Sequence, residues 1–281
     1  MGPRISHLLQ TILAREPHIQ KILSIVPERL GVHFQPQPAN DEHSRHLAVL
    51  YRDNPQSLLE PGEMAIPVGS LFAIDQHGHP LLKQWVRLSK GADDAQAMQA
   101  FFKDYASIAV PALLGMYLRY GVAFEAHQQN SFMVMGTNGQ ANRLLLRDFG
   151  DIRIDRKTLH AHGLDIELHD PKMTLYDDAG FVRDKLLHTV FMCHLGELVL
   201  LSARHFDIPE GLLWDELSAQ VRECFDDLRS QVEPQRWQTE RAALLEQDWP
   251  AKSFMRMRLM ESHADIVGRL PNPLSTAANV G

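Results

Sequence analysis

The residues best suited to chemistry in this chain lie close together near the middle of the sequence. Glu125, His127, Gln129 and Asn130 fall within one short stretch, and Asp148 follows beyond two apolar runs. Carboxylate and amide oxygens suit Mg²⁺, which proteins usually hold with one or two groups while substrate phosphates supply others. Asn130 and Asp148 are therefore candidates to share one metal ion beside a phosphate-bearing substrate, with Glu125 and His127 within reach of the same place.

A β-hairpin is expected to bring these residues together. Two β-patterned runs, Ser131–Met135 and Arg143–Leu146, are joined across the turn residues Asn138 and Gly139. Both turn residues tolerate positive φ, and Asn-Gly between two such runs is the strongest short hairpin signal. Immediately upstream, Gly121 ends a long apolar helix pattern in the position of a C-terminal cap.

The register of this hairpin predicts which polar residues face each other. Centred on the Asn-Gly turn, it pairs residues whose numbers sum to about 277, which places Asn130 opposite Arg147 and next to Asp148. Because facing strands lie about 5 Å apart, we expect the Asn130 amide and the Asp148 carboxylate to lie on the order of 4–6 Å apart, close enough to share one ion. The alternative is an ordinary hairpin with polar ends.

These motifs resemble a known family. Glu-x-His-x-Gln-Asn, a hairpin and then Arg-Asp-Phe-Gly is similar to the IucA/IucC family, the siderophore synthetases that work without a peptide-synthetase assembly line. Asp151 is a departure, because many members carry a second glycine there, so the loop after Asp148 is expected to differ locally. The resemblance covers nearly the whole chain and extends to Gly2–Ser6, His46–Pro55, Glu63–Leu71, Lys252–Leu259 and Pro271–Leu274.

The resemblance implies an ATP-dependent ligase. A carboxylate of citrate or of a related acid attacks the α-phosphate of ATP, which gives an acyl-adenylate and pyrophosphate. An amine, or sometimes a hydroxyl, then displaces AMP. ATP and Mg²⁺ are the implied cofactors, and the acid and its nucleophile are the implied small-molecule partners.

The same resemblance assigns roles to residues of the motif. Glu125, Asn130 and Asp148 would serve the metal and the nucleotide phosphates. His127 would lie near the reacting carboxylate, and Gln129 would hydrogen-bond the acid or the nucleotide. His127, Gln129 and Asp148 are therefore the catalytic candidates.

Three cationic residues outside the motif are further candidates. Arg4 would contact the nucleotide, and Lys252 and Arg258 would contact the acid, because guanidinium and ammonium groups pair well with phosphate and carboxylate. Surface or structural salt bridges are the alternative for all three.

Members of the resembled family run to roughly twice this length. Their first half carries a Ser/Thr-rich segment ending in Arg-Thr and a His-Pro-containing stretch, both part of the nucleotide site, and neither occurs here. We expect this chain to be a C-terminal portion that includes the FhuF-like region, to lack activity without the N-terminal half, and to form a homodimer when complete.

Three other classes of protein are alternatives. His127, Asn130 and Asp148-Phe149-Gly150 are also typical of kinase-like phosphotransferases, but Gln129 stands where a kinase needs its catalytic aspartate, and a Gly-rich phosphate loop is absent. A ferric-siderophore reductase would need four cysteines for its iron–sulfur cluster. A non-catalytic fragment that binds nucleotide or metal stays open.

Composition narrows the setting further. The formal net charge of −7, without a basic run, argues against nucleic acid as a main partner. Cys193 and Cys224 lie in helix-patterned segments, as expected for buried thiols in a reducing, cytoplasmic compartment. We identify no run of the roughly 20 apolar residues needed to span a bilayer, and expect no membrane association. His194 is expected to pack inside its helix.

The elements that position the site predict an α+β fold. A small mixed or antiparallel sheet with the catalytic hairpin occupies residues 1–180, and a mostly helical C-terminal lobe occupies residues 181–281. The expected strands before the hairpin are Val32–Phe34, Leu47–Tyr51 and Met64–Val68, with a polar loop at Gln35–Ser44. The expected helices are Arg4–Ser24 with a break at Glu16-Pro17, Leu81–Leu88, Ala95–Ile108 capped by Asp93 or Asp94, Ala112–Tyr120 after a kink or new start at Pro111, Phe181–Phe206, Glu210–Ser230, Arg236–Glu246 and Ala251–Ser262.

Overall fold

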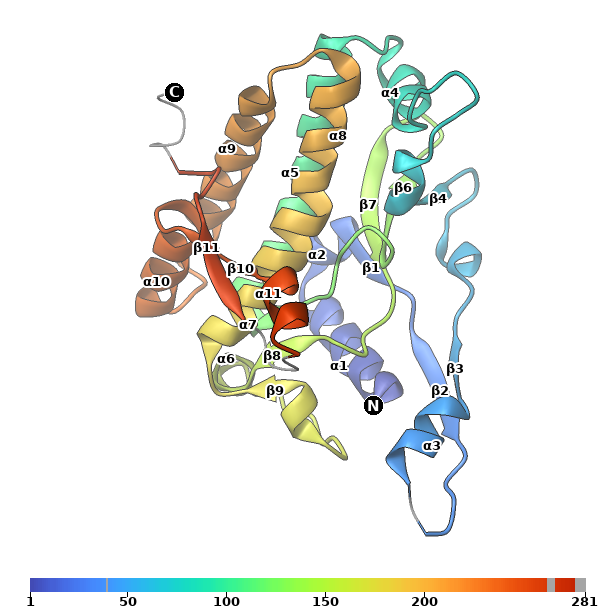
Figure 1. Ribbon diagram of the computed structural model, residues 1–281, viewed down its shortest axis with the longest axis vertical. Coiled ribbons are helices and arrows are strands. Elements are labelled where there is room, and N and C mark those ends of the chain that lie inside the picture. The colour runs from blue at the N-terminus through green and yellow to red at the C-terminus, as the bar shows by residue number, and fades with distance from the viewer. Residues whose placement is uncertain (39, 262–265, 276–281) are drawn as a thin grey trace.

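A long central helix, α5 (Ala95–Tyr120), leads directly into the motif. In the computed structural model, which describes residues 1–38, 40–261 and 266–275, α5 lies beside α8 (Glu197–Phe206) and α9 (Glu210–Leu228) (Figure 1). The Asp94 side chain caps its start by accepting the N–H of Ala97 at 2.8 Å. The helix runs through Pro111 without a second start and ends at Gly121, whose φ of 71° is left-handed, as predicted.

The main sheet is mixed and contains the hairpin. Its strand order is β1-β7-β6-β4, in which β6 (Ser131–Met135) pairs antiparallel with both neighbours and β1 (Leu23–Ile25) runs parallel to β7 (Ala141–Leu146). Strand β4 (Met64–Pro67) forms one edge. The predicted α+β class and the small mixed sheet are confirmed.

The N-terminal helices end earlier than predicted. Helix α1 (Gly2–Arg15) and helix α2 (Pro17–Ile22) are separated at Glu16, as expected from the proline that follows. The prediction that the helix continues to Ser24 is wrong, because Leu23–Ile25 pairs with β7 and buries Leu23 completely. Tertiary pairing here overrides the helical pattern of apolar residues.

A two-stranded ribbon projects from the body of the protein (Figure 1). It consists of β2 (Glu28–His33) and β3 (Ala48–Arg52), which pair antiparallel. The intervening segment contains α3 (Asp41–His46), where we expected only a polar loop. The Asn40 side chain accepts the N–H of His43 at 3.0 Å, and this N-cap favours a short helix in a polar sequence.

A second small sheet, of order β5-β8-β9, combines one strand that precedes the hairpin with two strands that follow it. Its strands are short, and they join the end of α5 to the loop that follows the hairpin. Its strands are β5 (Val122–Ala123), β8 (Arg153–Asp155) and β9 (Leu175–Tyr176), and α6 (Arg156–Ala161) and the 3₁₀ turn Pro171–Met173 lie between β8 and β9. Earlier in the chain, before α5, lie α4 (Leu82–Lys90) and the 3₁₀ turns Pro55–Leu58 and Val68–Phe72.

The C-terminal part is mostly helical, with one correction. The predicted helix Ala251–Ser262 is wrong at its start, because Ala251 and Lys252 belong to β10, which pairs antiparallel with β11; Ser262 lies outside the described residues. The elements are α7 (Ala179–Leu186), the π-helix Leu187–Gly196, α8, α9, α10 (Pro234–Leu245), β10 (Trp249–Lys252), α11 (Phe254–Leu259) and β11 (Val267–Leu270).

The continuous helical segment Ala179–Phe206 is long and apolar enough to cross a membrane by length and composition alone, contrary to the expectation from the sequence. Of the most apolar 18-residue stretch within this segment, 61% is buried inside the protein. It packs against α5, α9 and β10, and this burial is that of a core helix. The main core cluster draws on both predicted domains, from Ile5 to Leu274; the division at residue 180 stays a prediction.

Candidate functional site

The hairpin that carries the motif has the predicted register. Ser131 pairs with Leu146 and Met133 with Leu144, and the Arg147 N–H donates to the Asn130 carbonyl at 3.0 Å. Asn130 and Arg147 are therefore opposite each other, and Asp148 follows directly. At the far end, Gly139 has a φ of 74°, and a Cβ there would lie 3.0 Å from the Leu88 carbonyl oxygen, so glycine is needed for the turn and for the contact with α4.

The backbone that leads into the motif is fixed by hydrogen bonds from side chains, and not by pairing between strands. The Thr189 hydroxyl lies 2.9 Å from the carbonyl oxygens of both Phe124 and Lys185, and His194 Nδ1 donates to the Ala126 carbonyl oxygen at 2.8 Å. Both donors come from the π-helix, a rare form of helix that is often found at functional sites. Because buried backbone carbonyls need partners, these bonds fix the backbone on either side of Glu125.

His194 is a structural histidine, as predicted. It is fully buried, and its Nε2 accepts a hydrogen bond from the Tyr105 hydroxyl at 2.7 Å, since Nδ1 already donates to a carbonyl. Burial lowers its pKa to about 4. The imidazole therefore stays neutral at physiological pH and links α5 to the motif.

Asn130 completes this set of carbonyl contacts. Its Nδ2 donates to the Glu125 carbonyl oxygen at 3.1 Å, and its side chain is buried. Three successive carbonyls, those of residues 124, 125 and 126, are thus each held by a side chain. With the amide nitrogen used in this way, Oδ1 is the Asn130 atom that has the chemistry of a metal ligand.

Glu125 shares a buried lysine with Asp151. Lys185, whose side chain is only 5% exposed, lies 3.4 Å from Glu125 Oε1 and forms an ion pair with Asp151. Burial raises the pKa of the Glu125 carboxyl, and the ammonium of Lys185 opposes that rise. Asp151, noted in the sequence only as a departure from the resembled family, is the second anion that this lysine pairs with.

An ion pair with a residue of the β2–β3 ribbon holds the Asp148 side chain in position. Its φ of 67° is left-handed, which is uncommon for a residue other than glycine, and its Oδ2 lies 2.9 Å from Arg52 at the end of β3. Arg52 also pairs with the buried Glu28, whose carboxylate accepts the N–H of Phe149. Asp148 remains 44% exposed, so it is open to a ligand. Its distance of 4–6 Å from the Asn130 amide stays a prediction.

His127 and Gln129 form a tight turn at the start of the hairpin. His127 Nδ1 accepts the N–H of Gln129 at 3.3 Å, which leaves Nε2 as the ring atom with a proton to donate when the ring is neutral. The Gln129 carbonyl in turn accepts a bond from the Arg147 guanidinium at 3.1 Å. His127 is partly exposed and Gln129 is exposed, as required of side chains that meet a substrate.

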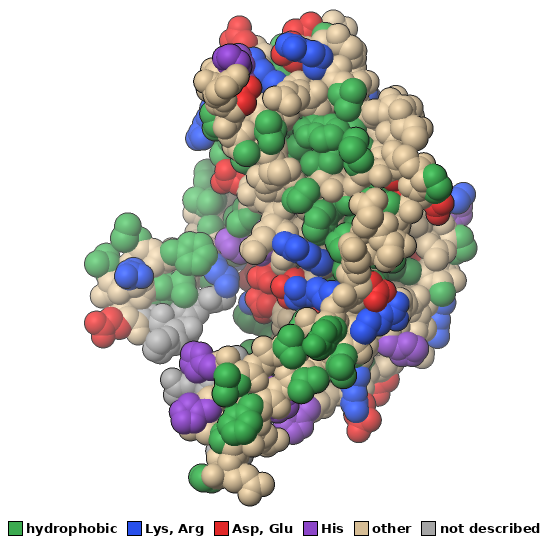
Figure 2. Space-filling view, turned by 90° about the vertical axis from the view of Figure 1, so that its right-hand side faces the viewer, with side chains coloured by type: hydrophobic (Ala, Val, Ile, Leu, Met, Phe, Trp, Pro, Cys, Tyr) green, Lys and Arg blue, Asp and Glu red, His purple; other side chains and the backbone are tan. Residues whose placement is uncertain are grey.

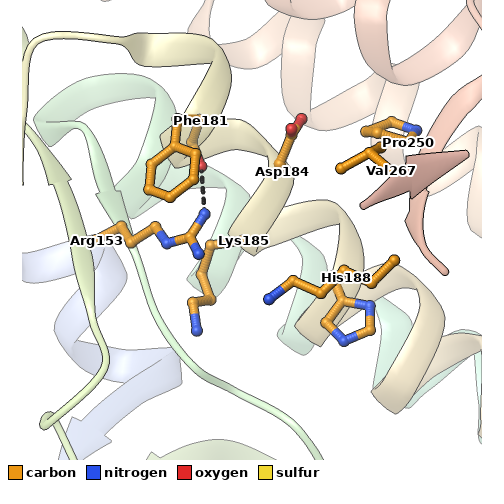
Figure 3. Close-up of a pocket in the computed structure, with 8 residues that line it drawn as sticks. Arg153, Phe181, Asp184, Lys185, His188, Pro250 and Val267 are labelled. Atoms are coloured by element: carbon orange, nitrogen blue, oxygen red, sulfur yellow. Dashed lines mark hydrogen bonds between the residues drawn. The ribbon is translucent and has the colours of Figure 1, made fainter. Parts of the chain in front are cut away.

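A cavity of about 210 Å³ adjoins Lys185 (Figure 3). Its polar lining is mainly basic, and three apolar residues complete it; the lining residues are Arg153, Phe181, Asp184, Lys185, His188, Pro250, Lys252 and Val267. Burial raises the pKa of the Asp184 carboxyl. Lys185 lines this cavity and also pairs with Glu125, so it links the cavity to the motif.

Of the three predicted cations outside the motif, only Lys252 lines this cavity. Arg4 donates to the Glu167 carbonyl at 2.5 Å and lies 3.7 Å from the Glu167 carboxylate, in a different cavity. Arg258 is exposed in the last turn of α11. Figure 2 shows the molecule from the right-hand side of Figure 1. On this face, acidic and basic side chains lie together at the edge of a hollow between the main body and a protruding segment.

The oxygen donors of the motif suit one kind of metal ion. Among residues 1–38, 40–261 and 266–275, no three His, Cys, Asp or Glu side chains come together as a metal-binding group. Glu125, Asn130 and Asp148 supply two carboxylates and one amide oxygen, which are hard oxygen donors. Donors of this kind are the ones that Mg²⁺ takes together with phosphate and water. In this structure Glu125 pairs with Lys185, and Asp148 pairs with Arg52.

The two cysteines are free thiols. Cys193 is partly buried with its sulfur 3.8 Å from His188 Nε2, and Cys224 is buried, which raises its pKa to about 12. A cluster held by four cysteine thiolates needs more thiols than the two that this chain supplies.

Comparison with known proteins identifies the family. Residues 1–73 match the IucA/IucC family, and residues 99–266 match the family described as ferric iron reductase FhuF-like transporter. The chain therefore belongs to the IucA/IucC family, with the FhuF-like region of that family over residues 99–266.

Two curated relatives illustrate the match. The uncharacterized protein y4xN of Sinorhizobium fredii is 36% identical, over 99% of this chain and 45% of that protein. A D-ornithine–citrate ligase of Staphylococcus aureus is 25% identical, over 81% of this chain and 36% of the enzyme. The chain thus spans less than half the length of these relatives.

A solved structure shows the same fold. ATP-bound aerobactin synthetase IucA of Klebsiella pneumoniae matches with a TM-score of 0.75 at 20% identity, over 98% of this chain and 48% of that chain. Similarity at this level of identity concerns the fold, and it confirms the α+β architecture expected from the sequence.

Proposed function

We propose that this chain is the C-terminal half of an ATP-dependent siderophore synthetase, which joins a carboxylate of citrate or a related acid to an amine or hydroxyl. The observation that carries the proposal is the similarity to a D-ornithine–citrate ligase over 81% of this chain, which includes the motif. The ATP-bound relative of the same fold supports ATP as the second substrate.

The proposed reaction has two steps. A carboxylate oxygen of the acid attacks the α-phosphorus of ATP, and pyrophosphate leaves. The nucleophile then attacks the acyl carbon and loses its proton, the bond between the acyl carbon and the phosphate oxygen breaks, and AMP leaves with the electron pair of that bond. Both steps place negative charge on phosphate oxygens, which the site must stabilise.

The motif residues have distinct proposed roles. Glu125, Asn130 and Asp148 would hold Mg²⁺, which would neutralise phosphate charge when bound. His127 would donate from Nε2 to the acid, since its Nδ1 is occupied by the N–H of Gln129. The exposed Gln129 side chain would hydrogen-bond acid or nucleotide.

The basic cavity beside the motif is proposed to take the acid. Lys252 and Lys185 line this cavity, so a carboxylate of the acid bound there would pair with an ammonium group. It would not contact the Glu125 carboxylate, which lies on the other side of Lys185 in this proposal. Arg4 and Arg258 stay candidates for phosphate or carboxylate contacts that need the rest of the polypeptide. The complete enzyme is proposed to be a cytoplasmic homodimer that needs no nucleic acid or membrane.

Two alternatives follow from the same site. A kinase-like phosphotransferase needs a base near the acceptor, and the His127-Gln128-Gln129 segment offers no carboxylate. A non-catalytic fragment would bind nucleotide or metal without turnover, and the exposed Asp148 is compatible with that role.

The test compares the chain alone with a fusion to the N-terminal half of the Sinorhizobium relative. Citrate-dependent pyrophosphate release and trapping of the activated acid by hydroxylamine are measured in both. We expect no turnover by the chain alone and turnover by the fusion. Robust turnover by the isolated chain would contradict the proposed division of the nucleotide site, and a fusion that binds ATP without turnover would favour the non-catalytic alternative.

A further inference from the structure

One face of the β2–β3 ribbon is entirely apolar. Residues that are directly opposite in an antiparallel pair point to the same side, and successive residues along a strand alternate sides. The pairs Leu30–Tyr51 and Val32–Val49, and the adjoining pair Phe34–Leu47 that is joined by a 2.8 Å backbone hydrogen bond, therefore share one face.

This face is open to solvent in the isolated chain. Its six side chains are between 50 and 62% exposed, and they belong to Leu30, Val32, Phe34, Leu47, Val49 and Tyr51. A contiguous exposed apolar patch marks an interaction site in a soluble protein, and two strands without a packed face are marginally stable in water. The ribbon needs a covering partner.

The ribbon is anchored next to the candidate site. At its base Arg52 pairs with Asp148, and Arg29 and Asp53 form a further ion pair with two contacts of 2.9 and 2.5 Å. The whole ribbon lies within residues 1–73, the part that matches the IucA/IucC family. Whatever covers its apolar face is thereby brought close to Asp148.

We propose that this apolar face is the docking surface for the remaining half of the synthetase polypeptide; the inference rests on the proposed function. The matched relative of the same fold carries more than half of its length outside the region shared with this chain, so a partner of sufficient size exists in the family. Docking there would bring the second half of the nucleotide site to Asp148. A second copy of this chain is the competing occupant, and the test separates the two.

The experiment measures the accessibility of the ribbon with Val49→Cys. Its rate of maleimide labelling is compared in the chain alone and in the fusion to the N-terminal half of the Sinorhizobium relative. Leu88→Cys, at an exposed residue of α4, is the matched control. Wild-type protein corrects for the native thiols, of which Cys224 is buried and Cys193 partly buried. We expect labelling at residue 49 to slow at least about ten-fold in the fusion, while labelling at residue 88 stays unchanged, as for a group that becomes buried in an interface.

Two results would overturn the proposal. Equal labelling of residue 49 in the two proteins would show that the other half does not cover the ribbon. Slow labelling in the isolated chain that becomes faster on dilution would assign the face to a second copy. Nucleotide turnover of the same fusion is measured separately, so a protected ribbon without turnover would reject the proposed function and leave the docking surface intact.

Discussion

His194 donates from Nδ1 to the carbonyl oxygen of Ala126 at 2.8 Å, across a sequence separation of 68 residues. The bond ties the π-helix to the backbone immediately before His127. Because catalytic side chains lose much of their effect when displaced by about 1 Å, the precision of the motif depends on contacts of this kind.

Replacing His194 with Phe should therefore damage activity without touching substrate. The Ala126 carbonyl and the Tyr105 hydroxyl would lose their partner, at a cost of about 1–3 kcal/mol in the free energy of unfolding. In the complete enzyme kcat should fall at least about ten-fold with little change in KM. His194→Asn keeps an N–H donor near Nδ1 and should recover part of the loss. Full activity of the Phe variant would contradict the positioning role.

The same histidine predicts a pH dependence of stability. Its pKa is about 4 in the folded chain and about 6.5 when unfolded, so the folded state is the weaker proton acceptor. Its contribution is fully present above pH 6.5 and is lost as the pH falls toward 4, by on the order of 2–3 kcal/mol. Urea unfolding between pH 7 and pH 4.5 measures this loss, and His194→Phe should reduce the slope. An unchanged slope in the variant would contradict the assignment.

Lys185→Met should destabilise the folded chain. It would leave Glu125 and Asp151 without their shared cation, and removing one partner of a buried ion pair costs about 3–5 kcal/mol, with a smaller cost expected here because Asp151 is half exposed. Thermal unfolding checks the effect, with Lys172→Met, at an exposed lysine, as the control. Adding Asp151→Asn to Lys185→Met should recover part of the stability. Equal melting temperatures for the Lys185→Met and Lys172→Met variants would refute the pairing.

How far the sequence predicts the site depends on the separation of its parts. The hairpin, its register and the cap at Gly121 follow from local turn chemistry, and all three were predicted. Thr189, His194 and Lys185 hold the motif from about 60 residues away or more, and a single sequence has no signal for such pairings. Arg52 was missed for the same reason.

Elements were mispredicted where tertiary contacts outweigh local preference. Leu23–Ile25 continues the apolar pattern of a helix, but pairing with β7 makes it a strand. Ala251 and Lys252, which were also predicted to be helical, form a strand because they pair with β11. In the ribbon, short runs bounded by proline and glycine predicted the strands, but they could not show that three cross-strand pairs would leave one apolar face uncovered.

Asp148→Ala in the complete enzyme should reduce both adenylate formation and amide formation by orders of magnitude, because it removes a proposed metal ligand and phosphate charge stabilisation. His127→Ala should cost less and should raise KM for the acid. Arg52→Gln breaks the ion pair with Asp148 while keeping the carboxylate, and should cost less than Asp148→Ala. Single-turnover kinetics measure each step. Equal losses for Arg52→Gln and Asp148→Ala would show that the ion pair, not the carboxylate as a ligand, is what matters.

The central claim is that ATP is split between its α- and β-phosphates on behalf of an acid. The direct measurement is chromatography of the nucleotides formed by the complete enzyme with ATP, Mg²⁺, citrate and a diamine, with reactions that omit either the acid or the amine as controls. We predict AMP and pyrophosphate, with steady turnover only when acid and amine are both present. ADP with a phosphorylated product would contradict the account and assign the site to a phosphotransferase.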